Sequence, residues 1–195
     1  MDILELANAV FDEIESEVNA TSKWKSTSKY ARIRHLQIDK RGSFGDRLLR
    51  DIFSKERNIS LAYRDGDQGE WDIKINEFKI EVKTSSLDVN NKFHPTGCEE
   101  VAEAKNEHIK NTPNCDFICF IGVAPDNLFM RLEKISEIDF NKLHNRGQRG
   151  TGAGYKWDFK KEQMREICTR EEVVALFYEK MKLDKRAIKK NLKEP

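Results

Sequence analysis

The chain has 195 residues, of which 35 % are charged and 38 % hydrophobic, and its mean hydropathy is -0.74. This length suits one domain with a hydrophobic core, and the 11 Phe residues together with regular apolar runs exclude wholesale disorder. No apolar stretch reaches the roughly 18 residues of a membrane span, and the acidic N-terminus is unlike a signal peptide. We therefore expect a cytoplasmic protein with no membrane partner.

The net charge of +1 conceals strong segregation of charge along the chain. Residues 1–20 contain six acids and no Lys or Arg, whereas residues 21–50 contain nine basic residues and two acidic ones. Residues 142–165 and 180–195 each contain seven basic residues and two acidic ones. Such blocks are typical of proteins that bind a polyanion, although solvated helix faces also carry them.

The N-terminal segment has the periodicity of an amphipathic helix, with apolar residues at Ile3, Leu6, Val10, Ile14 and Val18. A polar connector, TSKWKSTS, follows at residues 21–28. Lys23 and Lys25 flank Trp24 in it, a pattern that can grip nucleic acid but also anchors loops.

A second helix is predicted over residues 42–56, because Phe44, Leu48, Leu49, Ile52 and Phe53 share one stripe. Ser43 is a plausible N-cap, and with Asp46 it forms a Ser-x-x-Asp capping signature.

Two short strands around a polar turn at Asn76 are predicted over residues 71–86, WDIKINEFKIEVKTSS. Side chains alternate along a strand, so Glu81 and Lys83 share one side. The return of the hairpin brings Asp72, at the start of the first strand, close to Glu81. Asp67, in the preceding turn-rich loop, is an alternative to Asp72 as the first acid.

The remaining segments alternate between helix and strand. We predict a helix over residues 101–111, a strand buried on both faces over 115–125, a strand over 128–132 and a helix from Thr169 to about Met181. This order indicates an α/β fold. We expect one domain over residues 1–195, with an N-terminal helix and basic connector (1–30), a catalytic core (42–125), and a basic loop with C-terminal helices (142–195).

The sequence contains no pattern for zinc, disulfides or a nucleotide. Its four Cys residues have neither a CxxC pair nor His at zinc spacing, which indicates reduced thiols. The glycines of residues 147–154 lack the Lys-Ser/Thr ending of a P-loop, so we expect no nucleotide cofactor.

Asp72, Glu81 and Lys83 together suit phosphodiester chemistry. Two neighbouring carboxylates repel each other unless a cation lies between them, and Mg²⁺ accepts one or two carboxylates plus a substrate phosphate. Lys83 could orient the attacking water and offset charge that builds on phosphorus. The alternative is an ordinary solvated charged face.

Asp72, eight intervening residues and then Glu81-Val82-Lys83 resemble the motif of the PD-(D/E)XK nucleases, with Trp71 where the motif name has Pro. The resemblance implies a restriction-endonuclease-like core, with a central mixed β-sheet flanked by helices. It implies that Asp72 and Glu81 bind Mg²⁺ and that Asp46, on the preceding helix, completes or supports the metal site. Hydrolysis of double-stranded DNA would leave 5′-phosphate and 3′-hydroxyl ends.

A type II restriction enzyme, acting as a homodimer, is the member of this family that we expect. Arg146, Gln148 and Arg149 are candidates for contacts to bases or phosphates, because Arg and Gln can bond guanine and adenine edges. Lys156, Lys23 and Lys25 are further candidate DNA contacts. The alternatives are a structure- or modification-dependent nuclease of the same superfamily, and a DNA-binding module without catalysis.

Overall fold

The structure is a computed structural model that describes residues 24–25, 27–36, 38–63, 71–95, 115–138, 144–145 and 155–182. The helices predicted over residues 1–20 and 101–111 lie outside these ranges, so the prediction of one domain over residues 1–195 stays a prediction. The helical elements are η1 (Ala31–His35), α2 (Ile38–Phe53), η2 (Ile135–Glu137), η4 (Lys161–Gln163) and α4 (Arg170–Met181). The strands are β1 (Leu61–Tyr63), β2 (Ile73–Ile75), β3 (Phe78–Ser86), β4 (Lys92–Phe93), β5 (Phe117–Val123), β6 (Leu128–Lys134), β7 (His144–Asn145), β8 (Tyr155–Lys156), β9 (Phe159–Lys160) and β10 (Arg165–Ile167).

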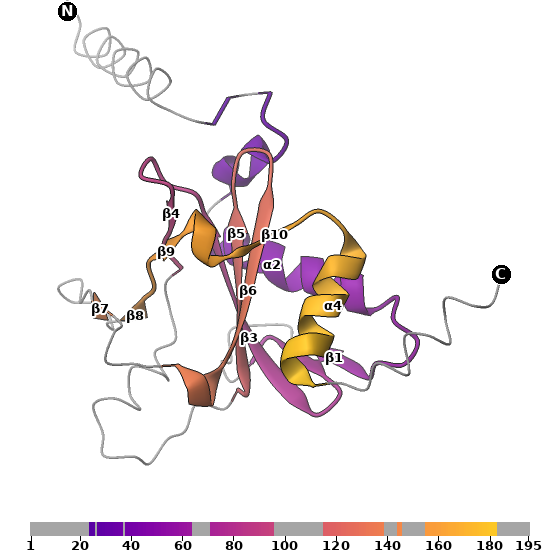
Figure 1. Ribbon diagram of the computed structural model, residues 1–195. Helices are drawn as coiled ribbons and strands as arrows, with labels where there is room; N and C mark the ends of the chain where they lie inside the picture. The colour runs from indigo at the N-terminus through magenta and orange to yellow at the C-terminus, as the bar shows by residue number, and fades with distance from the viewer. Residues whose placement is uncertain are drawn as a thin grey trace, which may run out of the picture.

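A six-stranded sheet of order β1-β2-β3-β5-β6-β10 forms the centre of the molecule. The β3–β5 pair is parallel and the other pairs are antiparallel, so the sheet is mixed. In Figure 1, α2 and α4 lie to one side of this sheet, and β4 and β9 lie to the other. The predicted α/β architecture, a central mixed sheet flanked by helices, is therefore confirmed. None of the helices in the described ranges is long and apolar enough to cross a bilayer.

The predicted hairpin is formed by β2 and β3, which pair from Ile73 opposite Ile80 to Ile75 opposite Phe78. Asn76 occupies the turn with a positive φ of 55°, a conformation that Asn tolerates better than most residues. Its side-chain oxygen accepts a hydrogen bond from the backbone N–H of Ser60 at 3.0 Å. The turn is thereby fixed to the residue that precedes β1.

The sheet separates two apolar clusters, and its central strands contribute to both through their alternating side chains. On the helix side, Val82 and Ile121 pack with Leu49 and Phe53 of α2 and with Phe177 of α4. The rings of Phe53 and Phe177 lie 4.9 Å apart between centroids, which joins the two helices. On the other side the cluster consists of Leu87, Phe93, Cys115, Ile118, Phe120, Ala124, Phe129, Ile135, Trp157, Phe159 and Met164.

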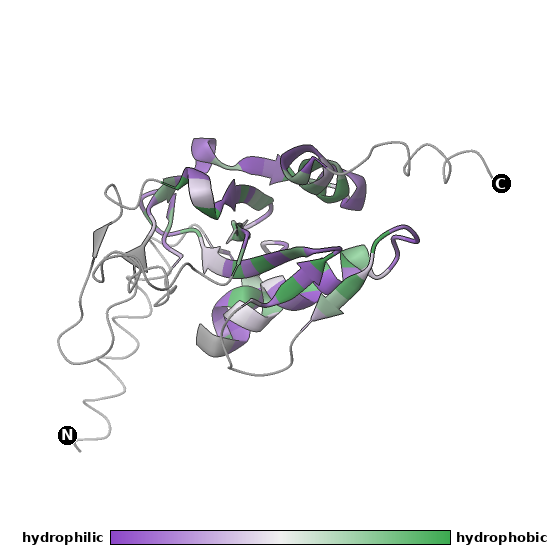
Figure 2. Cartoon of the chain, turned by 90° about the horizontal axis from the view of Figure 1, so that it is seen from below, coloured by the Kyte–Doolittle hydropathy of each residue, from purple (hydrophilic) through white to green (hydrophobic). Residues whose placement is uncertain are grey.

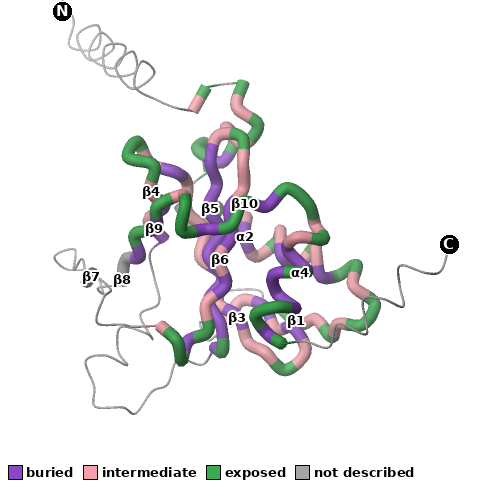
Figure 3. Tube along the Cα trace, viewed as in Figure 1, coloured by how far each residue is buried: buried purple, intermediate pink, exposed green. Residues whose placement is uncertain are grey.

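β5 is buried at every position, as its continuous apolar run predicts, and Figure 3 shows it in the buried colour at the centre of the tube. Along the strands of Figure 2, hydrophobic and hydrophilic bands alternate. These bands correspond to side chains that point to opposite faces of the sheet.

The two helices differ in how well the sequence predicts their starts. α4 begins as expected, because Thr169 and Glu172 form a capping box. α2 begins at Ile38, five residues before Ser43, so the expected start at residue 42 is wrong. Ser43 and Asp46 lie inside the helix and cannot cap it. In the first turn of α2, Arg41 donates to the carbonyls of Leu36 and Arg34 at 3.0 and 3.2 Å, which ties the start of the helix to the preceding segment.

Gly45 brings α2 unusually close to β3. A Cβ atom at this position would lie 2.2 Å from Oγ1 of Thr84 and 3.1 Å from side-chain atoms of Val82 and Ile121. Only a residue without a side chain allows this approach. Gly42, one turn earlier on the same helix, has nothing within 4 Å of such a Cβ.

We expect Gly45→Ala to lower the free energy of unfolding by about 1–3 kcal/mol, because the added methyl group overpacks the contact with Thr84. Gly42→Ala is the matched control. It should raise the free energy of unfolding by ~0.5–1 kcal/mol, because it only improves helix propensity. Urea unfolding of both variants measures the two changes. Equal stabilisation by the two substitutions would contradict a close contact at Gly45.

Candidate active site

Glu81 and Lys83 lie on the same side of β3, the side away from α2. Their side chains form an ion pair and are partly buried, with exposed fractions of 17 % and 21 %. In the parallel partner strand β5, Ile118 lies opposite Glu81 and Phe120 lies opposite Lys83. The ion pair therefore borders the apolar cluster on this side of the sheet.

Asp72 lies where the first strand of the hairpin begins, one residue before β2. Its backbone N–H donates to the carbonyl of Ile80 at 3.0 Å, which continues the ladder by one bond. Its Oδ2 accepts from the backbone N–H of Val82 at 2.6 Å. These two bonds join Asp72 to Ile80 and Val82, the residues before and after Glu81 in β3. The carboxylate of Asp72 thereby accepts from a β3 backbone N–H beyond the point where β2 ends.

Asp46 reaches this region from α2, one residue after the close approach at Gly45. The negative charge of Asp46 acts on Asp72, and it also adds to burial in raising the pKa of the Cys119 thiol in β5. The charges of Glu81 and Lys83 in turn act on the pKa of Asp46. The structure therefore brings Asp46, Asp72, Glu81 and Lys83 into one electrostatic neighbourhood.

Burial and mutual repulsion raise the pKa of two of these acids. The pKa of Asp46 rises to about 6, chiefly through burial and then through the charge of Glu81, while Lys83 acts in the opposite direction. The pKa of Asp72 rises to about 7 through burial, Glu81 and Asp46. The Val82 N–H and the Lys83 ammonium lower the pKa of Asp72 but do not compensate. A cation placed between these carboxylates would relieve the repulsion.

The donor set fits a hard cation such as Mg²⁺, because it consists of carboxylate oxygens. In the ranges that the structure describes, no three His, Cys, Asp or Glu side chains are gathered closely enough to form a metal cage. Mg²⁺ needs only one or two carboxylates, since waters and substrate phosphates fill its other positions. Asp72 and Glu81 could supply this pair. A role for Asp46 as a third ligand stays a prediction.

Most of the predicted DNA contacts lie where the structure gives no side chain. Lys23, Arg146, Gln148 and Arg149 are outside the described residues, as is the alternative acid Asp67, and of Lys156 only the backbone, in β8, is described. Lys25 is exposed. Its neighbour Trp24 donates from Nε1 to the carbonyl of Leu87 at 3.1 Å and packs against both apolar clusters. Trp24 therefore anchors its segment to the end of β3.

Sequence reasoning missed a two-stranded unit next to β3, which we name the β4–β9 ribbon (Lys92–Phe93 paired with Phe159–Lys160). His94 lies beside it with both ring nitrogens at carboxylates, Nδ1 at 2.5 Å from Asp158 and Nε2 at 2.8 Å from Asp88. The backbone N–H of His94 donates to Oγ of Ser85 at 2.9 Å. The scattered acids of this cluster have no sequence spacing that could have revealed it.

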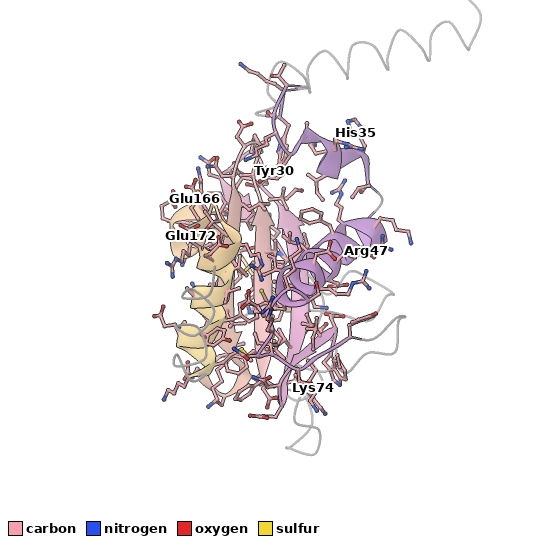
Figure 4. The ribbon with its side chains drawn as sticks, turned by 90° about the vertical axis from the view of Figure 1, so that its right-hand side faces the viewer. Tyr30, His35, Arg47, Lys74, Glu166 and Glu172 are labelled. Atoms are coloured by element: carbon pink, nitrogen blue, oxygen red, sulfur yellow. The ribbon has the colours of Figure 1, made fainter. Side chains whose placement is uncertain are left out.

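A cavity of about 210 Å³ lies elsewhere, on the helix side of the sheet. It is mainly apolar, and its lining includes Leu48, Ile52, Ile121 and Val173. None of the four site residues lines it. Figure 4 looks onto this face, where α4 and α2 stand side by side in front of the strands. The cavity is thus separate from the candidate active site.

Comparison with known proteins gives one remote likeness. No protein-family model matches the chain, and no curated protein matches it. Among solved structures, a bacterial homing endonuclease, I-Ssp6803I, is similar over 64 % of this chain and 76 % of its own, with 8 % identity and a TM-score of 0.38. A TM-score at this level does not establish a shared fold.

The raised pKa values predict that the acids destabilise the folded protein at neutral and alkaline pH. Between about pH 4 and pH 7 the folded protein binds more protons at Asp46 and Asp72 than the unfolded chain does, so the free energy of unfolding falls as pH rises. Asp72→Asn should therefore be more stable than the wild type at pH 8, by about 1–3 kcal/mol, and nearly equal to it at pH 4.

The Asn side chain keeps an acceptor oxygen for the Val82 N–H, so this variant tests charge and not the hydrogen bond. Asp51→Asn, at an exposed position of the same helix as Asp46, is the control and should change neither value. Denaturant unfolding at the two pH values measures the difference. An Asp72→Asn variant that is less stable than the wild type at pH 8 contradicts the crowding of acids described above.

Proposed function

We propose that this chain is a Mg²⁺-dependent DNA endonuclease of the PD-(D/E)XK type. The observation that carries the proposal is the grouping of Asp72, Glu81 and Lys83 where the pairing of β2 with β3 ends, within the electrostatic influence of Asp46, with Asp46 and Asp72 at raised pKa. A solvated charged face does not explain it, because exposed carboxylates are neither partly buried together nor raised in pKa by one another. The D-x8-E-x-K spacing and its place on a hairpin add support.

Each residue has a role in this proposal. Asp72, held by the Val82 N–H, and Glu81 would bind the metal, and Asp46 would support them from α2. When bound, Mg²⁺ supplies Lewis acidity and a lowered pKa of coordinated water. Lys83, paired with Glu81, would orient the attacking water and stabilise negative charge that develops on the phosphate oxygens. Partial burial of this pair strengthens both effects.

A type II restriction enzyme that acts as a homodimer is the form of this activity that we propose. A symmetric site cut on both strands calls for two copies of the metal site. Digestion of a long plasmid tests the proposal against its relatives. Discrete, reproducible bands support sequence-specific cutting, whereas cutting only at branched or modified DNA supports a structure- or modification-dependent nuclease.

We expect the wild-type protein to cleave duplex DNA in Mg²⁺ and to stop when the metal is chelated. Asp72→Asn, Glu81→Gln and Lys83→Ala should each lower the single-turnover cleavage rate at least ~100-fold, because each removes a group that acts on the reacting phosphate. Glu137→Gln and Lys180→Ala change exposed residues away from the site and are controls that should cut at the wild-type rate. If Lys83→Ala cleaved DNA at the wild-type rate, the assignment of this site to the reaction would be wrong. If the wild-type protein bound DNA but cleaved it in no divalent metal, a non-catalytic DNA-binding module would be favoured.

Metal binding has a readout without DNA. Millimolar Mg²⁺ should raise the thermal unfolding temperature of the wild type at pH 8, because a ligand that binds only the folded state stabilises it, by about 2.7 kcal/mol at 100 times its Kd. The shift should disappear with a chelator and in the double variant Asp72→Asn/Glu81→Gln. Asp51→Asn should keep it. An equal shift in the double variant would place the metal elsewhere.

A further inference from the structure

Lysines lie directly opposite each other at two places in the described sheets. Lys74 of β2 is paired with Lys79 of β3, and Lys92 of β4 is paired with Lys160 of β9. Like charges directly opposite on neighbouring strands destabilise the pairing. Both arrangements therefore cost stability in the protein alone.

No acidic side chain of the described residues forms an ion pair with any of these four lysines. Lys160 is exposed, and Lys74, Lys79 and Lys92 are partly exposed. Their charges are thus accessible to an anion from solution.

The Lys74–Lys79 pair faces the same side of the sheet as the proposed catalytic residues. Ile73, Ile75, Ile80 and Val82 belong to the apolar cluster on the helix side. Because side chains alternate, Lys74 and Lys79 point the other way, together with Glu81 and Lys83.

The Lys92–Lys160 pair lies on this same side of the sheet. It is on the outer face of the β4–β9 ribbon, the face that points away from the sheet. The partners that alternate with these lysines, Phe93 and Phe159, are buried against the sheet. Phe93 lies over Gly122, where an added Cβ would lie 2.8 Å from the Phe93 ring. The ring centroids of Phe159 and Phe120 are 4.8 Å apart. With both Phe rings turned inward, the two lysines are directed outward.

The two pairs lie toward opposite ends of β3. Lys79 is the second residue of β3, and Lys83 follows it at about 13 Å along the strand. The ribbon follows the other end of β3, where Leu87 bridges to Phe93. In Figure 4, Lys74 is at the lower end of the sheet, and in Figure 1 the ribbon lies toward its upper end. Glu81 and Lys83 lie between the two pairs.

The ribbon is held firmly beside β3. The ring of His94 bridges Asp88 and Asp158, and its backbone N–H donates a hydrogen bond to Oγ of Ser85. Burial acts to raise the pKa of Asp88, but hydrogen bonds from the Lys92 N–H, the His94 ring and the Asn90 N–H outweigh it and lower that pKa. Asp88 therefore accepts from the backbone N–H of Lys92 as an anion, and these bonds fix the ribbon beside the end of β3.

We propose that these two opposed lysine pairs bind phosphates of duplex DNA on the two sides of the phosphodiester that Glu81 and Lys83 address. Duplex DNA carries one negative charge about every 1.7 Å along its axis, so two lysine pairs at opposite ends of β3 would each meet phosphates of one duplex. The phosphates would remove the like-charge repulsion within each pair. This inference rests on the proposed function and adds the path of the DNA over the protein.

The test compares DNA binding by paired charge-removal variants, Lys74→Gln/Lys79→Gln and Lys92→Gln/Lys160→Gln, with the wild type. Binding to a labelled duplex is measured in chelator, where no cutting is expected, over a range of salt concentrations. Each lysine that no longer neutralises a phosphate should make the slope of log K against log salt shallower by about 0.9. We therefore expect each double variant to have a slope shallower by about 0.9–1.8 and to bind ~10-fold more weakly at moderate salt.

Two controls separate charge from folding. Lys134→Gln/Lys180→Gln removes two exposed lysines, one at the end of β6 and one on α4, and should leave the slope unchanged. Lys92→Arg/Lys160→Arg and Lys74→Arg/Lys79→Arg keep the charges and should bind with the wild-type slope.

The outcomes separate this inference from the proposed function. Unchanged slopes in either Gln double variant, with normal binding and cutting by the wild type, overturn the two-sided path and leave the nuclease proposal intact. A wild type that neither binds nor cuts duplex DNA overturns the proposed function itself. Shallower slopes in both Gln variants and not in the controls support the inference.

Discussion

The close contact between α2 and β3 at Gly45 is the constraint on which the candidate site depends. It places the helix against Thr84 and Val82 with no side chain between them. Asp46, the next residue, is thereby carried into the field of Glu81 and Lys83. A side chain at position 45 would push α2 away from the sheet. Asp46 would then lie farther out in solvent, where its charge would be screened. The packing of this helix is therefore also part of the electrostatics of the site.

Crowding of acids is costly in a protein without a bound cation. Partial burial and mutual repulsion raise the pKa of Asp46 and Asp72, although the Val82 N–H and Lys83 both favour the ionised form of Asp72. Structural ion pairs normally balance positive and negative groups, whereas this cluster has three acids and one described base. Such an imbalance is typical of sites whose charge is completed by a ligand. The two opposed lysine pairs show the converse imbalance on the face of the sheet to which Glu81 and Lys83 point.

The two faces of the sheet have different tasks in this protein. The helix side holds an apolar cluster in which Phe53 and Phe177 join α2 to α4, and it contributes stability. In the described part of the chain, the β4–β9 ribbon covers the other side at one end of β3, and Glu81 and Lys83 lie on that side with exposed fractions of 17 % and 21 %. Phe93 and Phe159 attach the ribbon to the apolar half of this face.

Periodicity and spacing alone determined the hairpin, the buried strand β5, the capping box of α4 and the placement of Glu81 and Lys83 on one side of β3, because these features depend on local geometry. The start of α2 was mispredicted, since a capping signature at Ser43 says nothing about the bonds from Arg41 to the carbonyls of Leu36 and Arg34. Only the tertiary structure decided that Asp46 joins the other acids and that Val82 holds Asp72. It also decided the pairing of Lys92 with Lys160, 68 residues apart in the chain. Contacts between distant segments depend on how the sheet and helices pack, and no spacing along the sequence encodes them.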